Sequence, residues 1–321
     1  MTKIGYHASH EQFAPSALLR WVQLAEKAGF DAAKSSDHIH PWSERQAQSG
    51  FAWSWLAAAM QATALPFGSI TAPGYRYHPA IVAHAAATLG EMFPGRFWLA
   101  LGSGEAINES ITGEYWPDKP ERNAKLRECV DIIRALFDGE TVTHRGRVTV
   151  VEAKIWSRPE KPVPLYGAAV SPETAKFCGK WADGLLTVAG ADTDSARKVI
   201  DAFREGGGEG KPIALQSALS WAPTDKEAEE EADHQWSSAS IGGDAAWDLR
   251  RPQDFDTVAG KVPVEKMRQT IPIGSSLDFH LEWIGKLLEL GPSELHLHQV
   301  GRDQEGFIET FGTRVLPQLR R

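Results

Sequence analysis

The chain has 321 residues, of which 42 are acidic and 34 basic, so its formal net charge is -8. An acidic chain without a Lys/Arg run offers no field that attracts nucleic acid or an anionic membrane surface, so we expect neither partner. Only two cysteines occur, neither at metal-ligand spacing from another thiol or imidazole, and no apolar run is long enough for a leader or a membrane span. We therefore expect a protein of the reducing cytoplasm.

The first half of the chain alternates predicted strands with predicted helices. Apolar runs bounded by turn residues predict strands over 4–8, up to His38, over 67–73 and over 97–101. Helical spacing of apolar residues predicts helices over 15–29, 51–63, 78–93 and 120–137. This order is typical of repeated strand-helix units around a parallel sheet.

The second half resumes the same alternation after an interruption. Residues 141–158 alternate β-branched and polar side chains around Arg145-Gly146, which predicts an inserted hairpin. Further strands are predicted over 163–170, 184–189, 213–221 and 294–300, and helices from 172, over 193–205, 225–236, 277–290 and 304–319. Residues 237–261 have little periodicity, so we expect an irregular excursion on the pocket side.

Eight strand-helix units without a linker favour a closed parallel barrel over an open sheet. We therefore predict an α/β fold, a single (β/α)8 TIM barrel with two insertions, as one domain over residues 1–321. In such barrels the active site lies at the carboxyl ends of the strands. The polar strand ends should thus converge on one mouth and bind a small molecule.

Two predicted strands end in side chains that can do chemistry. Asp37, His38, His40 and Trp42 follow the second strand, and Pro41 prevents further ladder pairing there. The fourth strand ends in a glycine-rich run that carries Glu105 and then Asn108. The two strand ends together predict one active site.

Five segments in the same order resemble the luciferase-like flavin and deazaflavin oxidoreductases. They are 36–42, 68–71 followed by 76–80, 94–97, 101–109 and 182–184, and the resemblance is greatest to the deazaflavin-dependent glucose-6-phosphate dehydrogenases and their FMN-using relatives. The resemblance implies a TIM barrel that passes a hydride between a tricyclic ring and a small alcohol or carbonyl compound. It leaves a reduced-flavin monooxygenase open, and we also expect a homodimer.

The resemblance implies catalytic roles for three residues. His38 matches the base, Trp42 matches the tryptophan that holds the reacting complex, and Glu105 matches the acid that protonates the ring. Imidazole can accept a hydroxyl proton near pH 7, and a buried carboxyl has a raised pKa, so the chemistry is consistent with these roles. The simpler alternatives are a wall histidine, pocket packing and a helix-start carboxylate, respectively.

Further residues are expected to hold the ring and its side chain. Asp37 could orient His38 or bind the cofactor, and Asn108 could bind the polar edge of the ring. Ser69 and Ile70 resemble the family's bulge behind the ring, where a non-proline cis bond is common. The glycine-rich run brings in Ser103, and the small residues Gly167, Ala168 and Ala169 would admit the ribityl phosphate, although they could equally serve tight packing.

One departure from the family affects the substrate and the cofactor. Ala191 stands where the sugar-phosphate dehydrogenases carry a phosphate-binding lysine, which makes glucose 6-phosphate doubtful. Lys261, Lys266 and Arg268 are interpreted as surface charges. Because the mouth offers no cation for the anionic tail of the deazaflavin coenzyme F420, we expect loosely bound FMN, with F420 as the alternative.

A metal-dependent hydrolase on the same barrel is the competing class. His38 and His40 project to the same side of an extended segment, and His7, His296 and His298 could add ligands. No acidic ligand matches them on the later strands, so we expect no metal. A third hypothesis is a flavin carrier without catalysis, in which His38 and Glu105 would have no function.

Overall fold

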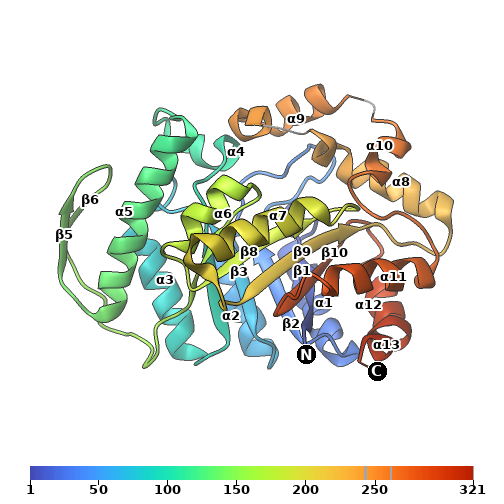
Figure 1. The fold of residues 1–321 in the computed structure, drawn as a ribbon, viewed down its shortest axis with the longest axis horizontal. Coiled ribbons are helices and arrows are strands. Elements are labelled where there is room, and N and C mark those ends of the chain that lie inside the picture. The colour runs from blue at the N-terminus through green and yellow to red at the C-terminus, as the bar shows by residue number, and fades with distance from the viewer. Residues whose placement is uncertain (242–243, 261, 321) are drawn as a thin grey trace.

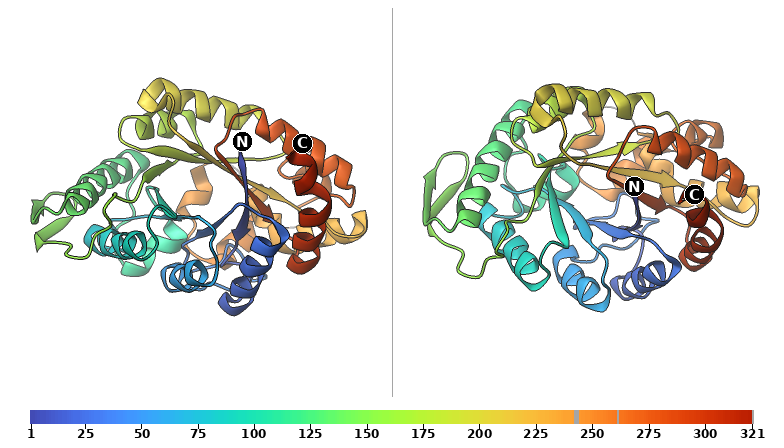
Figure 2. Two further views of the ribbon diagram at one scale, coloured as in Figure 1. Left: turned by 90° about the horizontal axis from the view of Figure 1, so that it is seen from below. Right: turned by 60° about the horizontal axis from the view of Figure 1, so that its bottom comes forward.

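The computed structural model describes residues 1–241, 244–260 and 262–320. Eight parallel strands form a closed barrel in the order β1-β10-β9-β8-β7-β4-β3-β2, as Figure 2 shows from the amino-terminal end. The strands are β1 Lys3–Ala8, β2 Ala32–Ser36, β3 Phe67–Thr71, β4 Phe97–Leu101, β7 Leu165–Ala168, β8 Gly184–Ala189, β9 Ile213–Leu219 and β10 Glu294–Gln299. The predicted TIM barrel is confirmed.

Helices cover the outside of this barrel (Figures 1 and 2). They include α1 Pro15–Ala28, α2 Ala52–Ala62, α3 Pro79–Met92, α5 Lys119–Asp138, α6 Pro172–Gly179, α7 Asp194–Phe203, α8 Asp225–Trp236, α11 Leu277–Leu288 and α12 Gln304–Thr310. Local sequence sets their ends: Thr224 and Glu227 form a capping box on α8, and Gly139 ends α5 in the left-handed region. No helix in the described ranges has the length and apolar character needed to cross a bilayer.

Aromatic rings fill the barrel interior near its amino-terminal end. Trp98 on β4 stacks on Tyr166 on β7 with ring centroids 4.6 Å apart. Gly68 on the neighbouring β3 makes this possible, because a Cβ there would lie 2.0 Å from the Trp98 ring. Gly68 is therefore needed here because it has no side chain. The stacked rings fill the barrel interior below the carboxyl ends of the strands.

The predicted hairpin is confirmed. Strands β5 Val142–Arg145 and β6 Thr149–Ala153 pair antiparallel and lie beside α5, away from the barrel (Figure 1). The His144 imidazole lies 3.0 Å from the Glu128 carboxylate of α5. The insertion is thus attached to the outer helix layer and leaves the mouth free.

The predicted excursion over residues 237–261 is present on the pocket side, but its described part is less irregular than expected. Its described part holds the short helices η3 Ser237–Ser240, η4 Asp244–Asp248 and α9 Pro252–Ala259, followed by α10 Val264–Arg268; residues 242, 243 and 261 lie outside the described ranges. A proline in the first turn and the Arg251–Asp254 pair favour α9 despite its weak periodicity. Trp116 donates a hydrogen bond of 3.0 Å to Asp248, and α9 lies at the same end of the molecule as α4 Ala106–Glu109 (Figure 1).

Candidate active site

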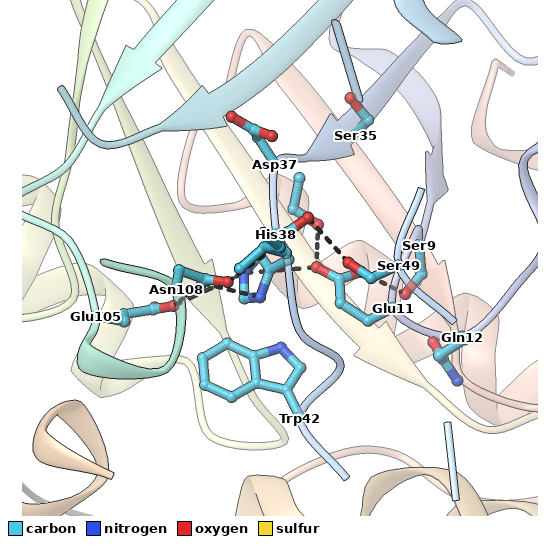
Figure 3. A network of polar contacts seen from close by, with 12 residues as sticks. Ser9, Glu11, Gln12, Ser35, Asp37, His38, Trp42, Ser49, Glu105 and Asn108 are labelled. Carbon is cyan, nitrogen blue, oxygen red and sulfur yellow. Dashed lines mark hydrogen bonds and ion pairs between the residues drawn. The ribbon is translucent and has the colours of Figure 1, made fainter. Parts of the chain in front are cut away.

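The ends of β2 and β4 meet through one amide side chain. Asn108 in α4 accepts a hydrogen bond from the Ile39 backbone N–H at 3.0 Å, and its Nδ2 lies 3.1 Å from His38 Nδ1 and 3.2 Å from Glu105 Oε2 (Figure 3). Asn108 is buried, so these partners satisfy both ends of its amide. The structure thus brings His38, Glu105 and Asn108 together, as expected from the sequence.

The Asn108 amide also bears on the tautomer of His38. With Oδ1 held by Ile39, Nδ2 donates to Nδ1 of the imidazole, so a neutral His38 carries its hydrogen on Nε2. For Nε2 to accept a proton, the hydrogen must sit on Nδ1 and the Asn108 carbonyl oxygen must face it. The orientation of this amide therefore decides which role His38 can take.

Glu11 is a residue of this site that the sequence analysis missed. It lies after β1, where the Ser36 hydroxyl donates to Oε1 at 2.6 Å and the Ser9 hydroxyl donates to Oε2 at 2.9 Å. His38 Nε2 lies 3.5 Å from Glu11 Oε1 and 3.7 Å from Glu105 Oε2, so one imidazole nitrogen stands between two carboxyl groups (Figure 3). The signal that could have found it is the polar run at 9–12, directly after the first strand.

The two carboxyl groups differ in proton affinity. Burial by itself raises the pKa of Glu11, but the His38 imidazole and the Ser36 hydroxyl outweigh it and bring the pKa to about 2. Burial raises the pKa of Glu105 above its ordinary value, although His38 opposes the shift. Neighbouring carboxyl groups with separated pKa values are the pattern of a fixed anion beside a proton-carrying acid.

Trp42 forms a wall of the site beside His38. The two rings lie 4.9 Å apart between centroids (Figure 3), and Trp42 meets Phe255 of α9 edge-on at 5.3 Å. The excursion thus supplies part of the apolar support of this wall. Trp42 and His38 are neighbours, as the sequence predicted. The second ring that packs against Trp42, Phe255, lies in the segment that was expected to be irregular.

Asp37 does not contact His38, although the two are adjacent in sequence. Its carboxylate accepts hydrogen bonds from the Thr71 hydroxyl at 2.8 Å and the Tyr77 hydroxyl at 3.2 Å, and lies 3.5 Å from Arg76. It points away from the imidazole in Figure 3 and is only 4% exposed. Of the two roles open to Asp37, orientation of the His38 ring is not what the structure has, because successive residues of an extended chain face opposite sides. Binding of the cofactor by Asp37 stays a prediction.

The expected bulge and cis bond at Ser69 and Ile70 are not found. All peptide bonds in the described ranges are trans, and β3 pairs in unbroken register with both neighbours. Ser69 contacts Ser35 at 3.2 Å on the outer side of the barrel, whereas Ile70 faces the interior cluster that contains Trp98. Of the two, Ile70 is the residue that faces the barrel interior.

The small residues at the ends of β4 and β7 differ in what they face. Gly167 packs against α6, because a Cβ there would lie 2.4 Å from Cys178, which favours the tight-packing alternative. Ala168 belongs to the interior cluster, and a Cβ on Gly102 would lie 3.6 Å from it. Ala169 is 5% exposed, and Ser103 is half-buried in the glycine-rich run. Ala168 and Gly102 therefore lie side by side at the ends of the neighbouring strands β7 and β4.

The histidines near the mouth do not form a metal site. No three His, Cys, Asp or Glu side chains within the described ranges are placed to hold a metal ion. His298 Nε2 lies 2.7 Å from the Gln12 side-chain oxygen, and His296 Nε2 lies 3.1 Å from the Glu294 carboxylate. The contacts of these imidazoles give no support to the hydrolase alternative.

The neighbourhood of Ala191 carries little positive charge. The Ala191 backbone N–H donates to the Thr270 carbonyl at 3.0 Å. Arg268 pairs with Glu229 and donates to the Ile273 carbonyl at 2.9 Å, while Lys266 is exposed and Lys261 lies outside the described residues. This agrees with the interpretation of Lys266 and Arg268 as surface charges.

A buried cation lies inside the barrel, below the site. Lys34 on β2 is 1% exposed, and its Nζ donates to the Gln216 side-chain oxygen at 2.7 Å. Burial lowers the pKa of Lys34 to about 7, and the charge of Glu11 opposes the shift. A lysine that titrates near neutrality is costly to fold and is typical of functional regions.

Comparison with known proteins identifies similar chains over nearly the full length. The family described as luciferase-like monooxygenase matches residues 1–294. The chain is 34% identical to the F420-dependent glucose-6-phosphate dehydrogenase of Microbacterium testaceum, over 99% of this chain and 98% of that protein. It is 35% identical to the F420-dependent glucose-6-phosphate dehydrogenase of Mycolicibacterium smegmatis, over 99% of this chain and 98% of that protein.

Solved structures with the same fold include two enzymes named for the same coenzyme. An F420-dependent secondary alcohol dehydrogenase in complex with an F420-acetone adduct superposes with a TM-score of 0.91 at 33% identity, over 100% of both chains. The coenzyme F420-dependent tetrahydromethanopterin reductase from Methanopyrus kandleri gives a TM-score of 0.79 at 23% identity, over 99% of both chains. The second likeness shows a shared fold.

The low pKa of Lys34 predicts how stability depends on pH. Above pH 7 the unfolded chain still binds the Lys34 proton and the folded chain releases it, so the folding cost of this lysine is full below pH 7 and shrinks as pH rises toward 10.5. Lys34→Met should therefore stabilise the protein most at pH 6, and its advantage should fall by about 2–3 kcal/mol by pH 9. Urea unfolding at a series of pH values measures this.

The exposed Lys198 provides the control, since Lys198→Met removes a lysine from the surface of α7. Its unfolding free energy should follow that of the unchanged protein at every pH. If the unfolding free energies of Lys34→Met and the unchanged protein differ by the same amount at every pH, the expectation is contradicted.

Proposed function

The chain belongs to the luciferase-like monooxygenase family, and from that premise we propose that it is a coenzyme F420-dependent oxidoreductase acting on small, uncharged alcohols and the corresponding carbonyl compounds. The observation that carries the proposal is His38 Nε2, which lies between the low-pKa Glu11 carboxylate and the raised-pKa Glu105 carboxyl group. Such a site can exchange one proton with a hydroxyl group and hold a second for a reduced ring.

The expectation of FMN as the cofactor was wrong. The curated relatives at 34% and 35% identity, and the solved alcohol dehydrogenase at 33%, are all F420-dependent. The expectation had relied on missing cations at the mouth, but backbone amides and helix ends can also hold anionic groups. These relatives likewise give no support to the hydrolase alternative.

Several described residues fit a flat ring at the mouth. Gly102, Ala168 and Ile70 present small or flat apolar surfaces at strand ends, and Gly104 adopts a φ of 84°, which brings the backbone of the glycine-rich run close to Glu109. Ile70 and Ala168 would hold the ring, with Ser103 at its edge, while Asn108 holds His38 and Glu105 beside it. When bound, the deazaflavin supplies a ring carbon that accepts or returns a hydride.

The protein's own residues would then manage the protons. In alcohol oxidation, His38 Nε2 accepts the hydroxyl proton, in the tautomer that places the Asn108 oxygen against Nδ1–H. Glu11 remains ionised at 3.5 Å and stabilises the imidazolium that results. Glu105 keeps a proton available for the ring, and Trp42 with Phe255 excludes water beside the reacting atoms.

The apolar character of the mouth supports an uncharged substrate. Val188 on β8 and Val170 after β7 expose 47% and 49% of their surface where these strands end. Ala191 offers no charge to a phosphate group, in agreement with the departure noted in the sequence. The solved secondary alcohol dehydrogenase at 33% identity favours the same substrate class.

Direct titration with the two coenzymes tests the cofactor. F420 should bind with a dissociation constant in the micromolar range, and FMN should bind at least about tenfold more weakly, because the proposed site is that of a deazaflavin enzyme. Isothermal calorimetry with both coenzymes measures this. Tight binding of FMN without F420 binding would overturn the proposal.

Replacement of His38 tests the proton exchange. His38→Ala should lower turnover of a secondary alcohol by about 10²–10⁴-fold, because general acid-base catalysis is lost, while F420 affinity stays nearly unchanged. Steady-state kinetics and calorimetry separate the two effects. The exposed His84 on α3 is the matched control, and His84→Ala should leave both unchanged. Turnover within about twofold of the unchanged enzyme would remove His38 from this role.

Ala191→Lys tests the exclusion of phosphate from the substrate. A lysine at this position would add a cation near the mouth, so a phosphorylated substrate should gain about tenfold in kcat/KM relative to its uncharged analogue. Ala191→Met, of similar length and without charge, is the control. An unchanged enzyme that already prefers the phosphorylated compound would contradict the proposed substrate class.

A further inference from the structure

A buried arginine lies beside the site and has no role in the mechanism above. Arg76 belongs to the loop between β3 and α3, and only 6% of its side chain is exposed. Its guanidinium carbon lies 4.5 Å from the centroid of the Tyr77 ring, so the group rests on that ring. A buried cation is costly unless it is paired and hydrogen-bonded. The groups that Arg76 contacts therefore indicate what it holds in place.

On one side, Arg76 holds the segment that carries His38. Its Nη2 donates to the backbone carbonyl of Asp37 at 2.7 Å and lies 3.5 Å from Asp37 Oδ2. The Thr71 and Tyr77 hydroxyl groups donate to the same carboxylate. Because Asp37 immediately precedes His38, these contacts fix the backbone from which the imidazole projects.

On the other side, Arg76 holds the short helix α4, which follows Glu105 and contains Asn108. The Arg76 backbone N–H donates to Glu109 Oε2 at 2.9 Å, and its Nε lies 3.6 Å from Glu109 Oε1. The Glu109 N–H in turn donates to the Glu105 carbonyl at 3.0 Å, which closes this single turn. A helix of four residues has little stability of its own, so its position depends on tertiary contacts such as these.

The Glu109 carboxyl group is suited to such a link because it is buried next to its partner. Burial raises the pKa of Glu109 to about 7, and the charge of Arg76 is the main effect that opposes the shift. Gly104 permits the close approach, since a Cβ there would lie 2.9 Å from Glu109 Cγ. Without the guanidinium group, Glu109 would be protonated near pH 7 and could still accept the backbone hydrogen bond. Loss of the Arg76 side chain should therefore loosen the link without adding a bare carboxylate at Glu109.

We propose that Arg76 is a positioning residue: it joins the end of β2 to α4, and this sets the separation of His38 and Glu105. The inference rests on the proposed function, in which these two groups handle the two protons. The Asn108 Nδ2 lies 3.1 Å from His38 Nδ1 and 3.2 Å from Glu105 Oε2, so a small displacement of α4 breaks one of these contacts. Arg76 touches neither reacting group and acts through the backbone on both sides.

Arg76→Met tests the inference in the F420-bound enzyme. Its kcat for a secondary alcohol should fall by about 10–100-fold, because a misplacement on the order of 1 Å at the reacting groups has an effect of this size. KM and the dissociation constant of F420 should each stay within about threefold, since Ile70 and Ala168 beside the ring are unchanged. Arg76→Lys keeps the charge but loses the planar group that reaches both sides, so kcat should fall there too.

Arg134→Met is the matched control. Arg134 on α5 also contacts a backbone carbonyl, that of Trp181 at 2.7 Å, and a carboxylate, that of Asp183 at 3.0 Å, but in the outer helix layer. Thermal unfolding shows whether each variant is folded, and Arg76→Lys takes the place of Arg76→Met if the latter is not. The kcat of Arg134→Met should equal that of the unchanged enzyme. An equal fall of kcat in the two folded variants, or no fall in the Arg76 variant, would overturn the inference.

A double variant separates positioning from support of the fold. Added to Asn108→Ala, Arg76→Met should lower kcat by less than about threefold, because the contact that it maintains is already lost. If the two changes instead lower kcat independently, so that their effects multiply, Arg76 does not act through the Asn108 link and the inference fails.

Nuclear magnetic resonance of the cofactor-free protein provides a test that does not depend on the reaction. The nuclear Overhauser contact between the His38 ring and the Asn108 side-chain amide should be lost in Arg76→Met and retained in Arg134→Met. Its retention in Arg76→Met would contradict the inference. If F420 fails to bind, the proposed function falls, and this contact still decides the role of Arg76.

Discussion

Closure of the barrel by the pairing of β1 with β10 is the constraint on which the site depends. The two strands come from opposite ends of the chain, and their register places Gly5 opposite His296. A Cβ on Gly5 would lie 2.3 Å from the His296 ring, so the closed form requires a residue without a side chain there. On its other side β1 pairs with β2, so the segment after β1 brings Glu11 next to the end of β2, and the His38 imidazole obtains its carboxylate partner.

The barrel interior changes character from its amino-terminal end to the mouth. Stacked aromatic rings, Trp98 and Tyr166, fill the lower part, while Lys34, Gln216 and neutral histidines fill the middle. A polar layer inside a barrel costs folding free energy, and parallel barrels are usually filled with branched apolar side chains. This polar layer lies directly below the residues that would exchange protons.

The relatives and the site together narrow the function. Sequence similarity over nearly the whole chain assigns the family and points to a deazaflavin coenzyme, whereas the substrate depends on single positions at the mouth. Ala191, Val170 and Val188 make that region uncharged and apolar, although the sugar-phosphate dehydrogenases share the same barrel. The F420-dependent relatives therefore indicate the cofactor more firmly than they indicate the molecule that reacts.

The sequence by itself determined the elements and the barrel, because strand alternation, first-turn prolines and the Thr224 cap act over a few residues. It also placed His38, Glu105 and Asn108 at strand ends. Only the tertiary structure decided that Glu11 joins His38 and that α9 supports Trp42. These contacts join residues far apart in the chain, and they follow from strand pairing and helix packing, which no local pattern records.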